Sequence, residues 1–116
     1  MIKSEDRELL YEFIKLDMAI KSLQHDYEKL KQLKMSKVYI ELVDGLLKNL
    51  RNDFYNKKSL LGMKSISLVK WVKIDEYFSD IIFKTAGEDE VLRYANLALK
   101  THVENFIIER LKSHSF

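Results

Sequence analysis

The sequence predicts an all-α fold, a four-helix bundle-like single domain over residues 1–116 with a long N-terminal antiparallel helical hairpin. Proline is absent and there are only three glycines, so the residues that most often mark turns between strands are scarce. Apolar side chains recur at spacings of three and four through much of the chain. The composition, 47% hydrophobic and 33% charged, is typical of a globular domain with solvated outer helix faces.

The first helix is predicted over about residues 5–33. Three acidic residues, Glu5, Asp6 and Glu8, lie in its first turn, where the unpaired backbone amides favour negative charge. Its apolar positions alternate in spacing between four and three, which is a heptad pattern. These positions are Leu9, Phe13, Leu16, Ile20, Leu23, Tyr27 and Leu30.

The second helix is predicted over about residues 37–58, after a short break at 34–36. The same alternation of three and four continues there, at Ile40, Val43, Leu47, Leu50 and Phe54. A connection this short places the first two helices side by side in opposite directions.

The region after residue 62 fits two interpretations. The segment 66–74 is rich in β-branched residues and partly alternates, which is typical of a strand. However, Trp71, Ile74, Phe78 and Ile81 follow a helical spacing, and a single strand would have no evident partner. We therefore expect a third helix over about residues 67–85 and, after Gly87, a fourth over about 88–112.

The core of this bundle is expected to combine apolar residues from all four helices. It should comprise Leu9, Phe13, Leu16, Ile20, Leu23, Val43, Leu47, Leu50, Phe54, Ile74, Phe78, Ile81, Leu92, Leu99, Val103 and Phe106.

Positive charge is concentrated in the middle of the chain although the net charge is only +2. Residues 48–73 contain seven lysines and arginines and one acidic residue, Asp53. Such a cluster, with a tyrosine available for stacking, is what a nucleic acid or other polyanion requires. The candidate anion patch comprises Lys48, Arg51, Tyr55, Lys57, Lys58, Lys64, Lys70 and Lys73. The alternative is a solvated helix end, stabilised by the helix dipole and by pairing of Asp44 with Lys48.

No arrangement of residues predicts catalysis, a metal site, a cofactor or a small-molecule substrate. Cysteine is absent, which fits a reducing compartment and excludes thiolate chemistry. The Glu-x-x-His, H-E-x-x-H and G-x-S-x-G motifs do not occur. The sequence therefore predicts a cytoplasmic, non-enzymatic protein.

A second apolar strip on the first helix, Leu10, Ile14 and Met18, lies beside the heptad positions. It either packs inside the bundle or forms a face for a protein partner or a dimer. We accordingly expect a small regulator or adaptor that acts through protein–protein interaction or self-association. Nucleic-acid binding by residues 48–73 is the alternative, and contact with an anionic membrane surface, as in an immunity-type protein, is a third. Abundant lysine, isoleucine, asparagine and tyrosine point to an AT-rich bacterial or phage genome.

Overall fold

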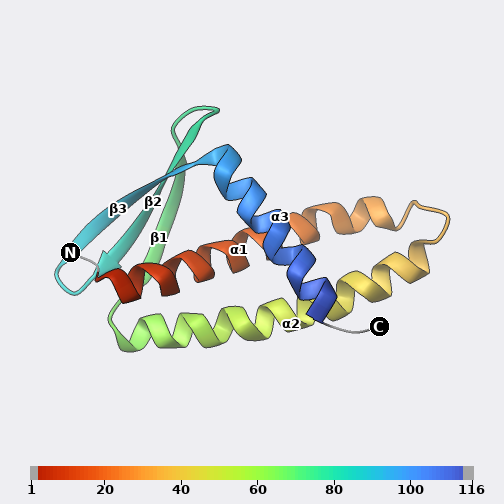
Figure 1. The fold of residues 1–116 in the computed structure, drawn as a ribbon, viewed down its shortest axis with the longest axis horizontal. Helices are drawn as coiled ribbons and strands as arrows, with labels where there is room; N and C mark the ends of the chain where they lie inside the picture. The colour runs from red at the N-terminus through yellow and green to blue at the C-terminus, as the bar shows by residue number, and fades with distance from the viewer. Residues whose placement is uncertain (1–2, 114–116) are drawn as a thin grey trace.

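The computed structural model describes residues 3–113 and has a mixed architecture, in which two helices are followed along the chain by a three-stranded sheet and then by a third helix (Figure 1). The predicted all-α four-helix bundle is therefore wrong, although its first two helices are confirmed to within a few residues. The elements are α1 (Ser4–Leu30), α2 (Ser36–Met63), β1 (Ser67–Lys73), β2 (Phe78–Thr85), β3 (Glu88–Ala95) and α3 (Asn96–Ser113).

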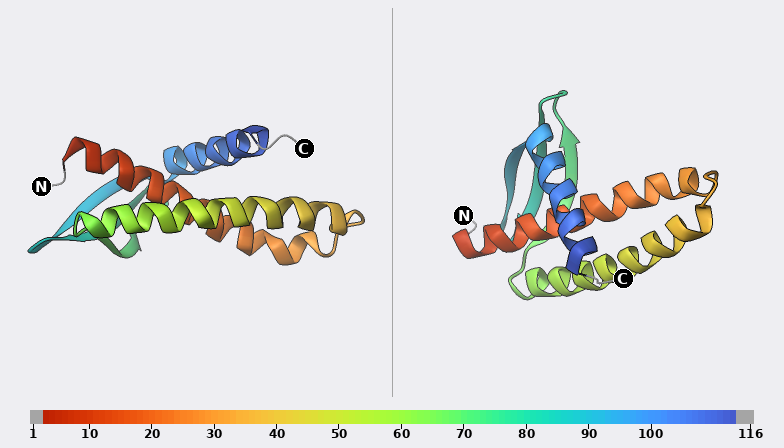
Figure 2. Two further views of the ribbon diagram at one scale, coloured as in Figure 1. Left: turned by 90° about the horizontal axis from the view of Figure 1, so that it is seen from below. Right: turned by 45° about the vertical axis from the view of Figure 1, so that its right-hand side comes forward.

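Helices α1 and α2 form the expected antiparallel hairpin, joined by residues 31–35. Helix α3 crosses the hairpin near its middle, and the sheet lies at one end (Figures 1 and 2). The other end of the hairpin, residues 20–45, projects beyond both and is called the arm below. The arm accounts for the elongated shape, whose longest extent is 51 Å and whose shortest is 20 Å. No helix within residues 3–113 has an apolar stretch long enough to cross a membrane.

The sheet is an antiparallel meander in the order β1-β2-β3, and two local turns explain why the predicted third helix does not form. At the first turn, the Asp75 carboxylate accepts hydrogen bonds from the backbone N–H groups of Tyr77, at 2.7 Å, and Phe78, at 2.8 Å. At the second, Gly87 adopts φ +100°, a conformation that favours glycine. These turns give residues 67–73 the strand partners that the sequence interpretation lacked.

The predicted fourth helix is correct only from Asn96 onward, because residues 88–95 pair with β2 as strand β3. Asn96 fixes the start of α3 to the β1–β2 turn through three hydrogen bonds. Its backbone N–H donates to the Tyr77 carbonyl at 2.8 Å, and its side-chain amide donates to the Asp75 carbonyl at 3.1 Å. The Ser79 hydroxyl donates to its side-chain oxygen at 2.6 Å. Helix α3 is thereby oriented from the sheet.

Helix α2 ends in a reversal at Ser65, which has φ 59°. The Ile66 N–H donates to the Leu61 carbonyl at 2.9 Å and the Ser65 N–H donates to the Gly62 carbonyl at 3.0 Å. This is a Schellman motif, and its usual hydrophobic contact is present because Leu61 and Ile66 are both buried. The motif turns the chain from the helix into β1.

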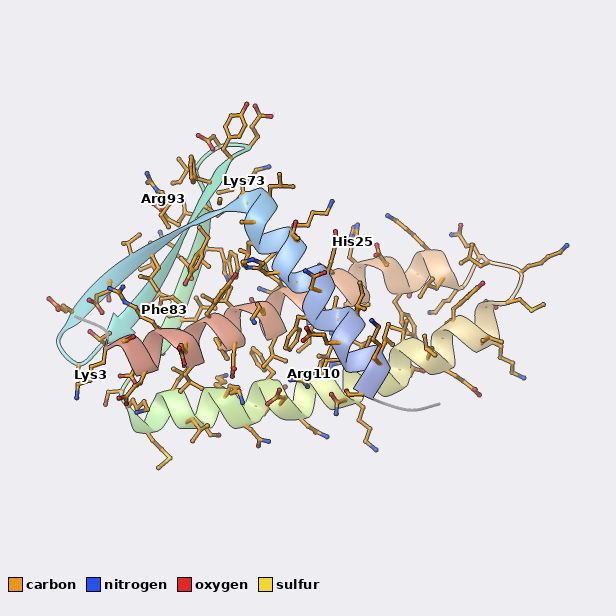
Figure 3. All side chains as sticks on the ribbon, in the orientation of Figure 1. Lys3, His25, Lys73, Phe83, Arg93 and Arg110 are labelled. Atoms are coloured by element: carbon orange, nitrogen blue, oxygen red, sulfur yellow. The ribbon has the colours of Figure 1, made fainter. Side chains whose placement is uncertain are left out.

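The core lies where one face of the sheet meets α1 and α3. Ile81 and Phe83 of β2 are fully buried in one cluster with Leu10 and Ile14 of α1; Figure 3 shows Phe83 near the junction of sheet and helix. Eight predicted core residues are confirmed as buried: Phe13, Leu16, Val43, Leu47, Leu50, Ile81, Leu99 and Val103. Ile74 and Phe78 are wrong, because they flank an exposed turn and are 46% and 42% exposed.

Candidate functional site

The candidate anion patch does not form one surface. Two of its lysines form ion pairs with acidic residues of α1. Lys57 Nζ lies 3.4 Å from an Asp53 oxygen and 3.6 Å from a Glu12 oxygen, while Lys64 Nζ lies 3.1 Å from an Asp6 oxygen. Their charges are therefore largely balanced by neighbouring carboxylates.

Two further members of the patch, Lys70 and Lys73, lie on β1 rather than on a helix. β1 leads away from the end of α2, and Figure 3 shows Lys73 at the far end of the sheet from that helix. At about 3.3 Å per residue, Lys73 lies roughly 20 Å along the strand from Ser67. These lysines cannot act together with those of α2 on one short ligand.

The remaining members, Lys48, Arg51, Tyr55 and Lys58, do share one side of α2. All four side chains are exposed, and within residues 3–113 none of the three cations forms an ion pair. The expected pairing of Asp44 with Lys48 does not occur among the described residues. Instead, the Asp44 carboxylate lies beside Tyr27 and raises the pKa of its hydroxyl. The predicted patch is thus reduced to a stripe of three cations and one tyrosine.

An ionic clamp on a different side of α2 joins the three helices, because Lys57 also pairs with Glu12 of α1. Arg110 of α3 donates to the Asn49 side chain at 3.0 Å and to the Asp53 carboxylate, and Asp53 also pairs with Lys57. Partial burial by itself would raise the pKa of Asp53, but Arg110 and Lys57 outweigh it and hold that pKa below its usual value. Figure 3 shows Arg110 where α3 passes over α2. The clamp fixes the C-terminal end of α3 on the hairpin.

The cleft next to the clamp is a structural contact between α1 and α3. It has a volume of about 320 Å³, lined by Tyr11, Lys15, His102, Asn105, Phe106 and Glu109. Tyr11 hydrogen-bonds His102 and stacks on Tyr94, with ring centres 5.6 Å apart, and burial raises the pKa of Tyr94. The Lys15 ammonium lies 5.0 Å from the centre of the Tyr11 ring. These polar groups contact one another and the cleft is shallow. Packing of α1 against α3 is therefore sufficient to explain their arrangement.

Metal ligation has no basis in the residues that the structure describes. Nowhere in 3–113 do three histidine, aspartate or glutamate side chains converge as ligands for an ion. The histidine that the cleft contains, His102, already bonds Tyr11.

The candidate partner face on α1 lies inside the molecule. Leu10 and Ile14 are fully buried in the core, and Met18 packs against the same cluster. These residues therefore pack inside the molecule, which is the first of the two alternatives that the sequence left open.

The arm carries apolar side chains that sequence reasoning did not single out. Leu33 and Met35 in the connection and three residues at the start of α2 are between 36% and 63% exposed. Met35, just before the helix, and the three helical residues recur at spacings of three and four, so they lie on one side of α2. We call the five residues the arm stripe: Leu33, Met35, Val38, Tyr39 and Leu42. Their spacing is visible in the sequence, but the sequence does not show that this part of α2 has no helix packed over it.

The side of α2 that carries the arm stripe is covered by α3 farther along the helix. Arg110 of α3 contacts Asn49 and Asp53, and Leu46 next to them is buried. Toward the tip of the arm that cover ends, and Leu42, Val38 and Met35 become exposed in turn (Figure 2). The stripe is therefore the uncovered continuation of a surface that is otherwise packed.

The face of the sheet that points away from the helices differs from the arm stripe. Exposed Val91 lies there, but Lys70 and the Asp80–Arg93 ion pair, at 2.7 Å, lie on the same face. Charges interspersed in this way are typical of a solvated sheet face.

Comparison with known proteins identifies a family. No curated protein and no solved structure matches the chain. The family model described as YhjD protein matches residues 1–115. Since that match spans nearly the whole sequence, the chain belongs to the YhjD protein family.

Proposed function

We propose that the protein acts by protein–protein interaction, as a small non-enzymatic regulator or adaptor of the cytoplasm, and that the arm stripe is its binding surface. The observation that carries this proposal is the exposure of five large apolar side chains at the end of a projecting helical hairpin. The absence of cysteine supports the cytoplasmic assignment, because a reducing compartment does not use disulfides.

The size of the arm stripe supports a binding role. From their exposed fractions the five side chains present roughly 500 Å² to water, within the range of the largest apolar patches on monomers, which are often functional. An amphipathic helical surface of this kind binds partners through side chains spaced three and four apart. The surrounding charged residues keep the stripe soluble when no partner is bound.

A pull-down from a lysate of the source organism tests this proposal. The bait is the tagged chain, and Leu42→Glu is the variant, because it places a charge on the stripe. The matched control is Leu60→Glu, which changes another exposed leucine of α2 outside the arm. We expect a protein that the wild type and the control retain and that Leu42→Glu loses, with circular dichroism showing all three folded. Equal recovery by all three, or no retention by the wild type, would refute the proposal.

Binding of a polyanion is a second candidate function, favoured by the unpaired cations Lys48, Arg51 and Lys58 beside Tyr55, which is 60% exposed. Three phosphate contacts predict that log K falls with log salt at a slope of about 2 to 3. Gel-shift titrations with the double variant Arg51→Glu and Lys58→Glu should show no binding. The double variant Lys70→Glu and Lys73→Glu on β1 is the control and should bind as the wild type does. No gel shift by the wild type at low salt would exclude this function.

A further inference from the structure

We infer that a pocket between α1, the end of α2 and the start of β1 binds a small monocarboxylate with an apolar tail, whose carboxylate pairs with Lys58. The pocket has a volume of about 280 Å³. It lies at the opposite end of α2 from the arm stripe, so this inference goes beyond the proposed function and does not depend on it.

The walls of the pocket are apolar and come from all three elements. Phe13 of α1 and Phe54 of α2 stack there, with ring centres 4.7 Å apart. Leu61 and Ile66, the hydrophobic pair of the Schellman motif, and Leu68 of β1 complete the apolar lining. The stacked rings and the capped helix end hold these walls in place without a ligand, so that little ordering opposes binding.

The charge at the pocket has one sign. Among residues 3–113, Lys58 is the one charged residue in the lining, which contains no carboxylate. The nearby Lys57 and Lys64 form ion pairs with carboxylates of α1 and α2, whereas Lys58 is exposed and forms none within the described residues. The ammonium of Lys58 is therefore available to an anionic ligand.

The end of a helix would by itself favour a cation, because its last carbonyl groups lack helical partners. Two of these carbonyls belong to pocket residues, and both are already hydrogen-bonded. The Leu61 carbonyl accepts from the Ile66 N–H at 2.9 Å. The Gly62 carbonyl accepts from the Ser65 N–H at 3.0 Å. The charge that the pocket favours in a ligand is therefore negative.

The number of donors favours a carboxylate over a phosphate. Phosphate sites combine several cations or the amides of a helix N-terminus, whereas this pocket offers one ammonium beside a helix C-terminus. The Ser67 hydroxyl, also in the lining, can donate to a second carboxylate oxygen. At about 30 Å³ for a group the size of a water molecule, the volume holds about nine such groups, which limits the tail to roughly six to nine carbon atoms.

A titration of the purified full chain with octanoate, followed by NMR, tests the site. Labelling with ¹⁵N-glycine gives three backbone amide signals, from Gly45, Gly62 and Gly87, and of these residues Gly62 lines the pocket. We expect the Gly62 signal to shift and the other two to stay, with a dissociation constant on the order of 0.1 to 1 mM. An unchanged Gly62 signal at about 10 mM octanoate, or equal shifts of all three signals, would overturn the inference.

The length of the tail tests the apolar walls. Affinity should rise roughly fourfold for each methylene added between butyrate and octanoate, because each is transferred from water to an apolar surface. It should then level off for tails that exceed the pocket. Affinity that is the same for butyrate and octanoate would refute a role for these walls.

Reversal of the charge at position 58 tests the choice of an anion. Lys58→Glu should weaken octanoate binding at least tenfold and should bind octylammonium instead, with a shift of the same Gly62 signal. The matched control is Lys48→Glu, about 15 Å away along the same helix, which should bind octanoate as the wild type does. Because Lys48 belongs to the cation stripe that a polyanion would use and not to the pocket, this control also separates the two sites.

Three outcomes of the charge reversal would overturn the assignment. These are octanoate binding by Lys58→Glu at wild-type affinity, equal binding of octanoate and octylammonium by the wild type, and failure of Lys58→Glu to bind octylammonium. Octylammonium binding by the variant shows in the same experiment that its pocket is folded.

Discussion

Replacement of Gly45 by alanine should stabilise the folded chain. Glycine inside a helix is less favourable than alanine by about 0.8 to 1.0 kcal/mol, and the new methyl group meets no described atom within 4 Å. For a urea m-value of about 1.5 to 2 kcal/mol per molar, the midpoint of unfolding should rise by about 0.5 M. Fluorescence of Trp71, the single tryptophan, follows the unfolding.

Gly87→Ala is the matched control, because the same chemical change is made where φ is +100°. Alanine is strained in that conformation, and the midpoint should fall, corresponding to a loss of about 1 to 2 kcal/mol. A Gly45→Ala midpoint equal to or below that of the wild type would refute the view that the fold does not require glycine at position 45.

Three further predictions concern stability and are measured by urea unfolding. Ser65→Gly should add about 0.5 to 1 kcal/mol, because it removes the strain of a side chain at φ 59°; no gain would mean that Ser65 is not strained. Asp53→Asn should cost about 1 to 2 kcal/mol at pH 7. Since the pKa of Asp53 is depressed in the folded state, this stabilisation is present above the unfolded pKa, near 3.9, and is lost as pH falls through the folded pKa. The free energies of unfolding of wild type and variant should therefore converge in acid, and a difference that stays constant with pH would contradict this. Phe83→Ala should cost about 3 to 5 kcal/mol, and a cost below 1 kcal/mol would place Phe83 outside the core.

The helical hairpin was predictable because its apolar residues keep a helical period over two long segments. The sheet was missed for a specific reason. A helical spacing occurs by coincidence at Trp71, Ile74, Phe78 and Ile81. In the structure, Trp71 and Ile81 pair across β1 and β2, and Ile74 and Phe78 flank the turn between these strands. The Asp75 side chain, which closes that turn, was the local signal against a helix.

The start of α3 was misplaced because the acidic residues 88–90 resemble a helix N-terminus. They instead lie on β3, and the helix begins at Asn96, which hydrogen-bonds Tyr77, Asp75 and Ser79 at the end of the sheet. The α2 part of the anion patch was predictable from spacing along one helix. The sequence did not show that Lys57 and Lys64 would be paired and so lost from the patch, because their partners Glu12 and Asp6 come from α1, which is distant in sequence.

Within residues 3–113, neither α3 nor the sheet packs over the arm (Figures 1 and 2). The molecule therefore has two parts that should differ in local stability. Residues such as Ile20 and Leu23 remain half-buried there, whereas Leu10 and Phe83 are fully enclosed. Backbone amides of the arm should exchange with solvent through local opening, while those around the core exchange only when the whole chain unfolds. A partner that binds the arm therefore orders the least protected part of the chain, and some of its binding free energy is used in that ordering.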